Sequence, residues 1–152
     1  MVRGVEAMSP RPMRADDEQT VRKLYAQGHP FWPSRAEPWY FTYPTLVMEV
    51  DGEILGFTSF AIGEMTGLRV VQGADLVVEL SYRGAGIGIA LHRARLALGA
   101  AVGATWFSGV TQPDNAAMHR IFLACGHHAC QPIRRYYPDG GDGVLYAGAI
   151  TE

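Results

Sequence analysis

Apolar residues recur along the chain with two periods, one of two residues and one near 3.6, and the change between them predicts alternating strands and helices. Strands are predicted at residues 12–14, 46–50, 54–61, 75–80, 104–110, 129–137 and 144–150. Helices are predicted at residues 16–27, from residue 87 to a stop at Gly99, and at residues 116–125, where Gly126 suits a left-handed cap. This order predicts an α/β fold with a mixed central sheet of about seven strands and helices on both faces.

Turn and loop signals separate these elements. Asp51-Gly52 stands between two apolar runs, and glycine accepts the positive φ of a tight turn, so a hairpin is expected there. Residues 28–44 combine four prolines with six aromatic side chains and cannot form one regular helix. They are expected to form an aromatic loop that covers either an acceptor pocket or the core. Residues 1–10 are typical of a disordered leader, which leaves a single domain over residues 11–152.

The charge of the chain is nearly balanced, with 13 Lys and Arg against 15 Asp and Glu and a formal net charge of −2. No run of like charges forms the basic stripe of a nucleic-acid binder, so nucleic acid is not an expected partner. Residues 1–82 hold 7 basic and 11 acidic side chains (net −4), whereas residues 83–152 hold 6 and 4 (net +2). An anion is therefore expected to bind the second part.

Cys125 and Cys130 are the two cysteines, which are too few for a disulfide framework. Reduced thiols and no metal site are expected. The first 14 residues contain neither the apolar core of a signal peptide nor a membrane-spanning run. A cytoplasmic protein without a membrane partner is therefore expected.

The most informative segment covers residues 77–91, where a strand-like run leads into a glycine-rich turn and then a helix. Gly84, Gly86 and Gly88 let a ligand approach the backbone, and unpaired amides at a helix start, with the positive end of its dipole, favour phosphate. Arg83 adds a positive charge at the rim. The segment therefore predicts a seat for a pyrophosphate.

Other phosphate-binding glycine turns do not fit. A P-loop requires Gly-Lys-Ser/Thr at its end, but Gly88 is followed by Ile89-Ala90. A dinucleotide-binding fingerprint requires a third glycine where Ile89 stands and an acidic residue where Ala104 stands. A glycine-rich connection without a ligand is the remaining alternative, and three glycines at one helix start argue against it because each costs stability.

The turn resembles the central motif of the GNAT N-acetyltransferases: Arg or Gln, two residues, Gly, one residue, Gly or Ala. Arg83, Gly86 and Gly88 match it. The resemblance implies acetyl-CoA as cosubstrate and a strand that separates from its parallel neighbour, so that Val78 and Leu80 can pair with the pantetheine arm. It also implies that the pyrophosphate is held by the backbone amides of Gly84, Ala85, Gly86, Ile87, Gly88 and Ile89.

A second match runs from Asn115 to His127 and is similar to the family's helix Asn-x-x-Ala-x-x-Leu-Tyr-x-x-x-Gly-Phe. The resemblance implies that Asn115 contacts the pantetheine and that Phe122 lies beside the cofactor. Taken alone, an Asn at a helix start is more often simply an N-cap. Residues 134–138, Arg-Arg-Tyr-Tyr-Pro, followed by Asp142, look like the ending of the ribosomal-protein alanine N-acetyltransferases, which is the closest subfamily resemblance.

Two positions depart from the family pattern, and both concern proton transfer. Phe122 stands where the family has a tyrosine that protonates the departing thiolate, and Val110 stands where it has a glutamate base. A positioned base contributes about 10²–10⁴-fold to such a step, so other groups are needed. His119 and His127 are of a type that suits a base, but His119 is expected to face the adenine end or solvent. The named catalytic candidates are Glu79, Asp75 and Tyr137.

The expected activity is direct transfer of an acetyl group from acetyl-CoA to a primary amine in a ternary complex. The acceptor is expected to be a protein N-terminus, as the subfamily resemblance implies, or a small amine, and the negative balance of residues 1–82 favours a cationic one. The alternative is a regulatory domain that binds acyl-CoA without catalysis, since Phe122 and Val110 replace the family's proton-transferring residues. A monomer and a homodimer both fit the sequence.

Overall fold

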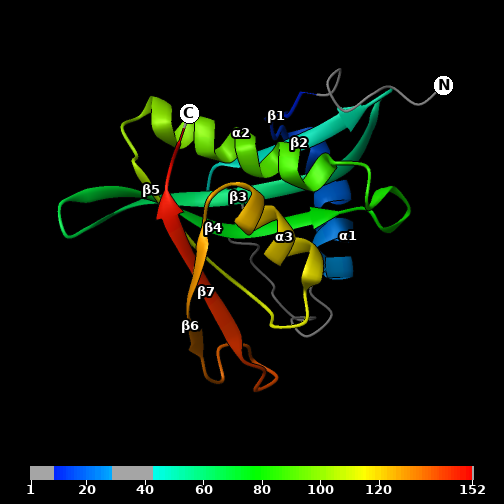
Figure 1. Cartoon of the computed structure of the whole chain (residues 1–152). Coiled ribbons are helices and arrows are strands. Elements are labelled where there is room, and N and C mark those ends of the chain that lie inside the picture. Colours follow the sequence, from blue (N-terminus) through cyan, green and yellow to red (C-terminus); the bar gives the residue numbers. More distant parts are fainter. Residues whose placement is uncertain (1–8, 29–42, 152) are drawn as a thin grey trace. The chain divides into compact units, whose positions relative to one another are not determined.

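The computed structural model describes residues 9–28 and 43–151, and Figure 1 shows the course of the chain. The described strands are β1 (Arg11–Pro12), β2 (Thr45–Val50), β3 (Glu53–Met65), β4 (Leu68–Val78), β5 (Trp106–Thr111), β6 (His128–Ile133) and β7 (Gly143–Ala149). The described helices are α1 (Glu18–Gly28), α2 (Ile87–Ala101) and α3 (Ala116–Ala124), with 3₁₀ turns η2 (Ala15–Asp17) and η4 (Leu80–Tyr82). The expected leader and aromatic loop fall almost wholly outside the described residues, so both stay predictions.

The strands form one sheet in the order β1-β2-β3-β4-β5-β7-β6. β4 and β5 are parallel, whereas β1–β2, β2–β3, β5–β7 and β6–β7 pair antiparallel. Parallel neighbours need a crossover connection, and the segment that contains α2 supplies it. The predicted α/β fold with a mixed sheet of seven strands is confirmed for the described part of the chain.

The chain divides into two compact units: the first is Met1–Ser59 with Asp75–Arg95, and the second is Phe60–Ala74 with Leu96–Glu152. In the first unit Val47 of β2 packs in a cluster with α1, whereas Met48 packs in another with α2. Successive strand residues point to opposite faces, so α1 and α2 cover opposite faces of the sheet in this unit. The expected single domain over residues 11–152 stays a prediction.

In the second unit aromatic side chains fill the space between α3 and the sheet. The ring of Phe122 from α3 lies 5.4 Å from that of Phe107 on β5 and 5.0 Å from that of Tyr146 on β7, centre to centre. Gly109 pairs with Tyr146 across the two strands, and a Cβ on Gly109 would lie 2.8 Å from the Phe107 ring. Glycine at this position therefore makes room for the three rings.

Two tight turns connect the first three long strands. Asp51 and Gly52 join β2 to β3 with φ angles of 52° and 82°, the positive pair of a hairpin turn. The predicted hairpin is thus confirmed. Thr66 and Gly67 make the same turn between β3 and β4, with φ angles of 50° and 81°. This second hairpin was not located from the sequence, because β3 continues to Met65 instead of ending near residue 61.

The predicted stop of α2 at Gly99 is wrong, because the helix continues to Ala101. A Cβ on Gly99 would overlap the side chain of Val71, so this glycine permits close packing of the helix on β4. The helix ends before Gly103, which has a φ of 91° and whose N–H donates to the carbonyl of Ala100 at 3.0 Å. At the end of α3 the predicted cap is confirmed, since Gly126 has a φ of 82°.

β6 is shorter than the predicted strand over residues 129–137, because the chain leaves the sheet after Ile133. Arg135 has a φ of 52°, and its N–H donates to Oδ1 of Asp142 at 3.0 Å, which closes the connection between β6 and β7. Tyr136 and Tyr137 therefore lie in this connection and not in a strand.

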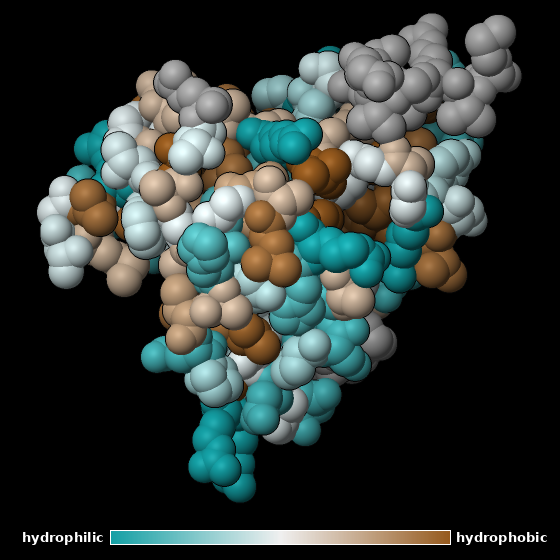
Figure 2. All heavy atoms as spheres, in the orientation of Figure 1, coloured by the Kyte–Doolittle hydropathy of each residue, from teal (hydrophilic) through white to brown (hydrophobic). Residues whose placement is uncertain are grey.

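No helix in the described part of the chain is long and apolar enough to cross a membrane. Large apolar side chains reach the surface at separate places, and Figure 2 shows such brown residues beside teal ones on one face. Scattered apolar surface of this kind is normal for folded proteins and by itself marks no binding site.

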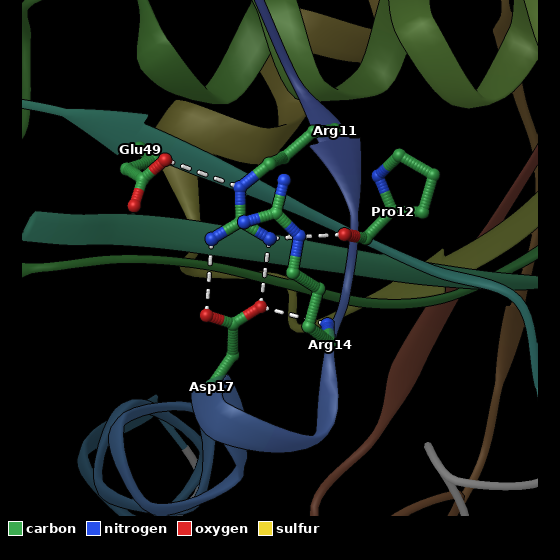
Figure 3. Close-up of polar contacts among 5 residues, drawn as sticks. All are labelled: Arg11, Pro12, Arg14, Asp17 and Glu49. Carbon is green, nitrogen blue, oxygen red and sulfur yellow. Dashed lines mark hydrogen bonds and ion pairs between the residues drawn. The ribbon is translucent and has the colours of Figure 1, made fainter. Parts of the chain in front are cut away.

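A charged cluster in the first unit joins β1, β2 and the start of the first helix (Figure 3). The guanidinium of Arg11 donates to both carboxylate oxygens of Asp17, at 2.8 and 3.0 Å, and to Glu49 at 3.2 Å. Asp17 is buried and also accepts the N–H of Arg14 at 2.7 Å. The hydrogen bonds from Arg11 hold the pKa of Asp17 below its usual range.

We expect Asp17→Asn to destabilise the protein by about 2 kcal/mol at neutral pH, because a bidentate bond to a charged partner is lost. The lowered pKa of Asp17 means that this contribution is present above its ordinary pKa, near 4, and is lost as the pH falls through the folded-state value. Urea unfolding of both proteins should therefore differ at pH 7 and converge in acid. A difference that persists unchanged in acid would contradict the assignment.

Candidate functional site

The glycine turn between β4 and α2 takes the left-handed conformation that its sequence suggests. Gly84 and Gly86 both have a φ of 86°, a region that other residues adopt only at a cost. Before the turn, Glu79 accepts the N–H of Ser81 at 2.8 Å and caps the 3₁₀ turn η4. The local sequence therefore fixes how the chain leaves β4 and enters the helix.

The first turn of α2 leaves backbone donors unused. The N–H of Ala90 bonds to the carbonyl of Gly86 at 3.2 Å, so the amides of Ile87, Gly88 and Ile89 precede the first intrahelical bond. Gly84 and the residue after it are exposed, and nothing lies within 4 Å of a Cβ built on Gly84. Free donors, an open approach and the positive end of the helix dipole together suit an anion.

The end of β4 offers an edge for a second extended chain. The N–H of Glu79 donates to Leu55 of β3 at 2.8 Å. Because amides of successive strand residues point to opposite sides, the N–H of Val78 points away from β3. The parallel pairing of β4 joins Val70–Gln72 to Trp106–Ser108, while β4 itself continues to Val78.

The backbone carbonyls of Val78 and Leu80, which were expected to pair with a ligand at this edge, already accept hydrogen bonds from within the protein. Nε of Arg83 donates to the carbonyl of Val78 at 3.2 Å, so the side chain folds back on the strand. Leu80 lies in η4, and not in a strand as expected, and its carbonyl accepts the N–H of Arg83 at 3.4 Å. The amides of this segment, more than its carbonyls, therefore remain suited to a ligand.

A cavity of about 800 Å³ in the first unit lies beside the same segment. Its lining includes the carboxylates of Asp16, Asp17, Glu49, Glu53 and Glu79. Asp17 and Glu49 are bonded to Arg11, and the remaining acidic lining does not suit a diphosphate.

In the second unit, α3 begins with an asparagine N-cap, which is the usual role of Asn at a helix start, and the pantetheine contact of Asn115 stays a prediction. Asn115 is its N-cap, and the side-chain oxygen accepts the N–H of Met118 at 3.2 Å. The side-chain NH₂ of Asn115 is then the group suited to donate to a ligand carbonyl. Phe122 is only 2% exposed and packs in the aromatic cluster under the helix.

Val110, which replaces the family glutamate, lies near a tyrosine. A Cβ on Gly143 would meet Val110 at 2.6 Å and Tyr136 at 3.2 Å, so both side chains border the same glycine. Tyr136 is 47% exposed, and its ring makes an edge contact with Tyr137 at 4.9 Å, centre to centre. Partial burial, with the nearby Tyr136 and the carboxylate of Asp114, raises the pKa of Tyr137 to about 12. The phenol of Tyr137 therefore keeps its proton at neutral pH.

Asp75 is a buried residue of β4 in the first unit. Its N–H donates to the hydroxyl of Ser59 at 3.1 Å, and its carbonyl accepts from the hydroxyl of Thr58 at 2.7 Å and from Arg95 at 3.4 Å. Nε of Arg95 also donates to Nδ1 of His92 at 3.0 Å. This network fixes the backbone that carries the Asp75 carboxylate.

Among residues 9–28 and 43–151, no group of three or more His, Cys, Asp or Glu side chains could hold a metal ion. The donors described above are the backbone amides at the start of α2 and the side-chain NH₂ of Asn115.

Comparison with known families agrees with this geometry. The model of the acetyltransferase (GNAT) family matches residues 14–127, which is most of the chain. The chain belongs to the GNAT acetyltransferase family. No curated protein sequence gives a significant match.

Solved structures of GNAT proteins share the fold of this acetyltransferase-family chain. The protein yncA from Salmonella typhimurium, solved with acetyl-CoA, has a TM-score of 0.80 at 20% identity and covers 96% of this chain and 95% of its own. Naa50 from Arabidopsis thaliana, solved with a bisubstrate analogue, has a TM-score of 0.78 at 18% identity, and the match covers 93% of this chain and 98% of Naa50. The ribosomal-protein-S18-alanine N-acetyltransferase from Escherichia coli has a TM-score of 0.73 at 18% identity, and the match covers 95% of each chain.

Sequence reasoning missed the polar residues of α2 in this GNAT chain. Arg95 is 2% exposed and His92 is fully buried, whereas the apolar Leu98 of the same helix is 45% exposed. The segment 92–95 reads His-Arg-Ala-Arg, and nothing local distinguishes the buried arginine from the exposed Arg93. The partners that bury Arg95 lie on β3 and β4, far away in sequence.

The raised pKa predicts that Tyr137 keeps its proton until the pH approaches about 12. Ring-carbon NMR assigned by Tyr137→Phe should show the phenol form through neutral and moderately alkaline pH. Because the folded state holds this proton more tightly than the unfolded chain, stability should fall as the pH rises from about 10 toward that value. A midpoint at or below the ordinary value would contradict the burial of this hydroxyl.

Proposed function

We propose that this chain transfers an acetyl group from acetyl-CoA to a primary amine, by direct transfer in a ternary complex. The observation that carries the proposal is the left-handed turn at Gly84 and Gly86, which presents the first amides of α2 beside the free edge of β4. The pyrophosphate binds to the amides of residues 84–89, and the pantetheine arm lies along β4. The amide of Val78 donates to the thioester carbonyl at the end of the arm, and Asn115 donates to the arm itself.

Two relatives support the substrates of this proposal. yncA was solved with acetyl-CoA, and Naa50 was solved with a bisubstrate analogue that joins coenzyme A to an acetylated peptide. A ligand that joins both substrates is compatible with acceptor and cosubstrate bound together. The ribosomal-protein resemblance favours a protein N-terminus as acceptor, and a small amine is the other candidate.

The chemistry requires a neutral amine, a polarised carbonyl and a proton for the leaving group. The nitrogen lone pair attacks the thioester carbon, the carbon–sulfur bond breaks, and the sulfur leaves as thiolate. A strand amide, that of Val78, hydrogen-bonds the carbonyl oxygen as negative charge develops on it. Holding both reactants in this geometry supplies a large part of the rate enhancement.

Three groups are candidates for moving the protons. Asp75 and Glu79 are carboxylates on or beside β4 and can accept the proton of the amine, whereas Tyr137 can donate one. Glu79 also caps η4, and Asp75 is held at its backbone by Ser59 and Thr58. Among the neutral variants Asp75→Asn, Glu79→Gln and Tyr137→Phe, the group that transfers the proton is the one whose loss lowers kcat and changes the pH profile.

A regulatory domain that binds acyl-CoA without catalysis is the second candidate function. Phe122 and Val110 favour it, because they lack the hydroxyl and the carboxylate of the family pattern. Incubation with acetyl-CoA and a panel of amines and peptides, followed by release of free thiol, separates the two functions. The proposed transferase releases thiol faster with at least one acceptor than without protein, and binding without any release supports the regulatory domain.

We propose a cytoplasmic protein, as a monomer or homodimer, that needs no metal. The negative charge of residues 1–82 favours a cationic acceptor. Because no metal takes part in the proposed reaction, treatment with a chelator should leave the transfer rate unchanged.

The proposal predicts that Gly86→Glu abolishes binding of coenzyme A, because a side chain and a negative charge enter the pyrophosphate seat. Calorimetric titration with coenzyme A measures this directly. Gly67→Glu is the matched control, since Gly67 has a similar φ of 81° and open space around it but lies in the β3–β4 turn. The control should bind like the wild type, and unchanged binding by Gly86→Glu would overturn the location of the site.

A further inference from the structure

His119 makes polar contacts through both ring nitrogens in the second unit. Nδ1 lies 2.5 Å from the hydroxyl of Tyr146, and Nε2 lies 3.1 Å from the carbonyl oxygens of both Gln112 and Pro113. The residue is half-buried and packs against the Tyr146 ring at 5.3 Å, centre to centre. The ring is therefore not simply turned to solvent, and the other expectation, that it faces the adenine end, stays a prediction.

The partners of the ring decide where its hydrogens lie. Carbonyl oxygens only accept, so Nε2 carries a hydrogen in the neutral ring and in the charged one. In the neutral ring Nδ1 then has a lone pair, and the hydroxyl of Tyr146 donates to it. The contact to the two carbonyls is kept in either protonation state of His119.

These carbonyls belong to the connection between β5 and α3, residues 112–115. Gln112 also accepts the N–H of Asn115 at 3.1 Å, so His119 and Asn115 share one carbonyl. On the other side of the ring, Tyr146 is buried in β7 and fixed by the neighbouring Phe122. A continuous set of contacts thus runs from β7 through His119 to the residue that caps α3.

We propose that His119 is a positioning residue that fixes the β5–α3 connection and, through it, orients Asn115 for coenzyme A. The inference rests on the proposed function, in which Asn115 donates to the pantetheine arm. The side-chain oxygen of Asn115 is used by the helix cap, so its NH₂ can meet the ligand only if the connection holds its position. Loss of His119 therefore weakens coenzyme A binding although His119 does not touch the ligand.

The test compares His119→Leu, which keeps the apolar bulk, with His119→Gln, which keeps a donor and an acceptor. We expect His119→Leu to raise both the Kd for coenzyme A and the KM for acetyl-CoA about tenfold, the equivalent of one lost hydrogen bond, with kcat changed less than about threefold. His119→Gln should recover most of the affinity, and Tyr146→Phe should show a smaller loss. His128→Leu, an exposed histidine of β6, is the control and should bind like the wild type.

Binding at wild-type affinity by His119→Leu, while Gly86→Glu abolishes binding, would overturn this inference and leave the proposed function intact. Normal binding by both variants would overturn both. A second measurement does not depend on the variants folding: nitrogen NMR of the ligand-free protein should show the hydrogen of neutral His119 on Nε2. A hydrogen on Nδ1 would overturn the assignment.

Discussion

The left-handed turn between β4 and α2 is the constraint on which the rest of the site depends. Two positive φ angles, at Gly84 and Gly86, rotate the chain so that the start of α2 presents its amides outward. Another residue type at either position would add backbone strain and would place a side chain in the proposed ligand site. The packing of Ile87 and Leu91 on the first unit then fixes the helix start. At the proposed site the ligand therefore meets backbone groups, which no side-chain substitution can supply or remove directly.

Elements with a local signal could be predicted from the sequence. Three such elements depend on a positive φ angle that the local sequence indicates: the turn at Asp51-Gly52, the cap at Gly126 and the glycine turn before α2. Gly99 and Gly109 are glycines for a different reason, which is packing and not a positive φ. Their missing side chains make room for Val71 and Phe107. At Gly99 the sequence therefore suggested a helix stop, whereas the structure has close packing against Val71, which lies far away in the sequence.

The candidate site divides in the same way. The sequence predicted the glycine turn that forms the proposed anion seat and the N-cap at Asn115, because each is a property of one short segment. The support behind them could not be predicted. Arg95 reaches carbonyls of β3 and β4, and His119 reaches β7, so each role depends on residues that only the fold brings together. A histidine or arginine within a helix does not reveal which carbonyl it will meet.

The two departures from the family pattern each have a tyrosine beside them. Tyr146 packs on Phe122, and Tyr136 borders the same glycine as Val110. When His119 is neutral, however, the hydroxyl hydrogen of Tyr146 is donated to Nδ1 of His119. The same hydrogen cannot also protonate a thiolate. In the roles proposed above, the hydroxyl next to Phe122 holds the β5–α3 connection and does not supply a proton. On the proposed function, this shifts the work of the enzyme from acid catalysis toward orientation of the bound cosubstrate.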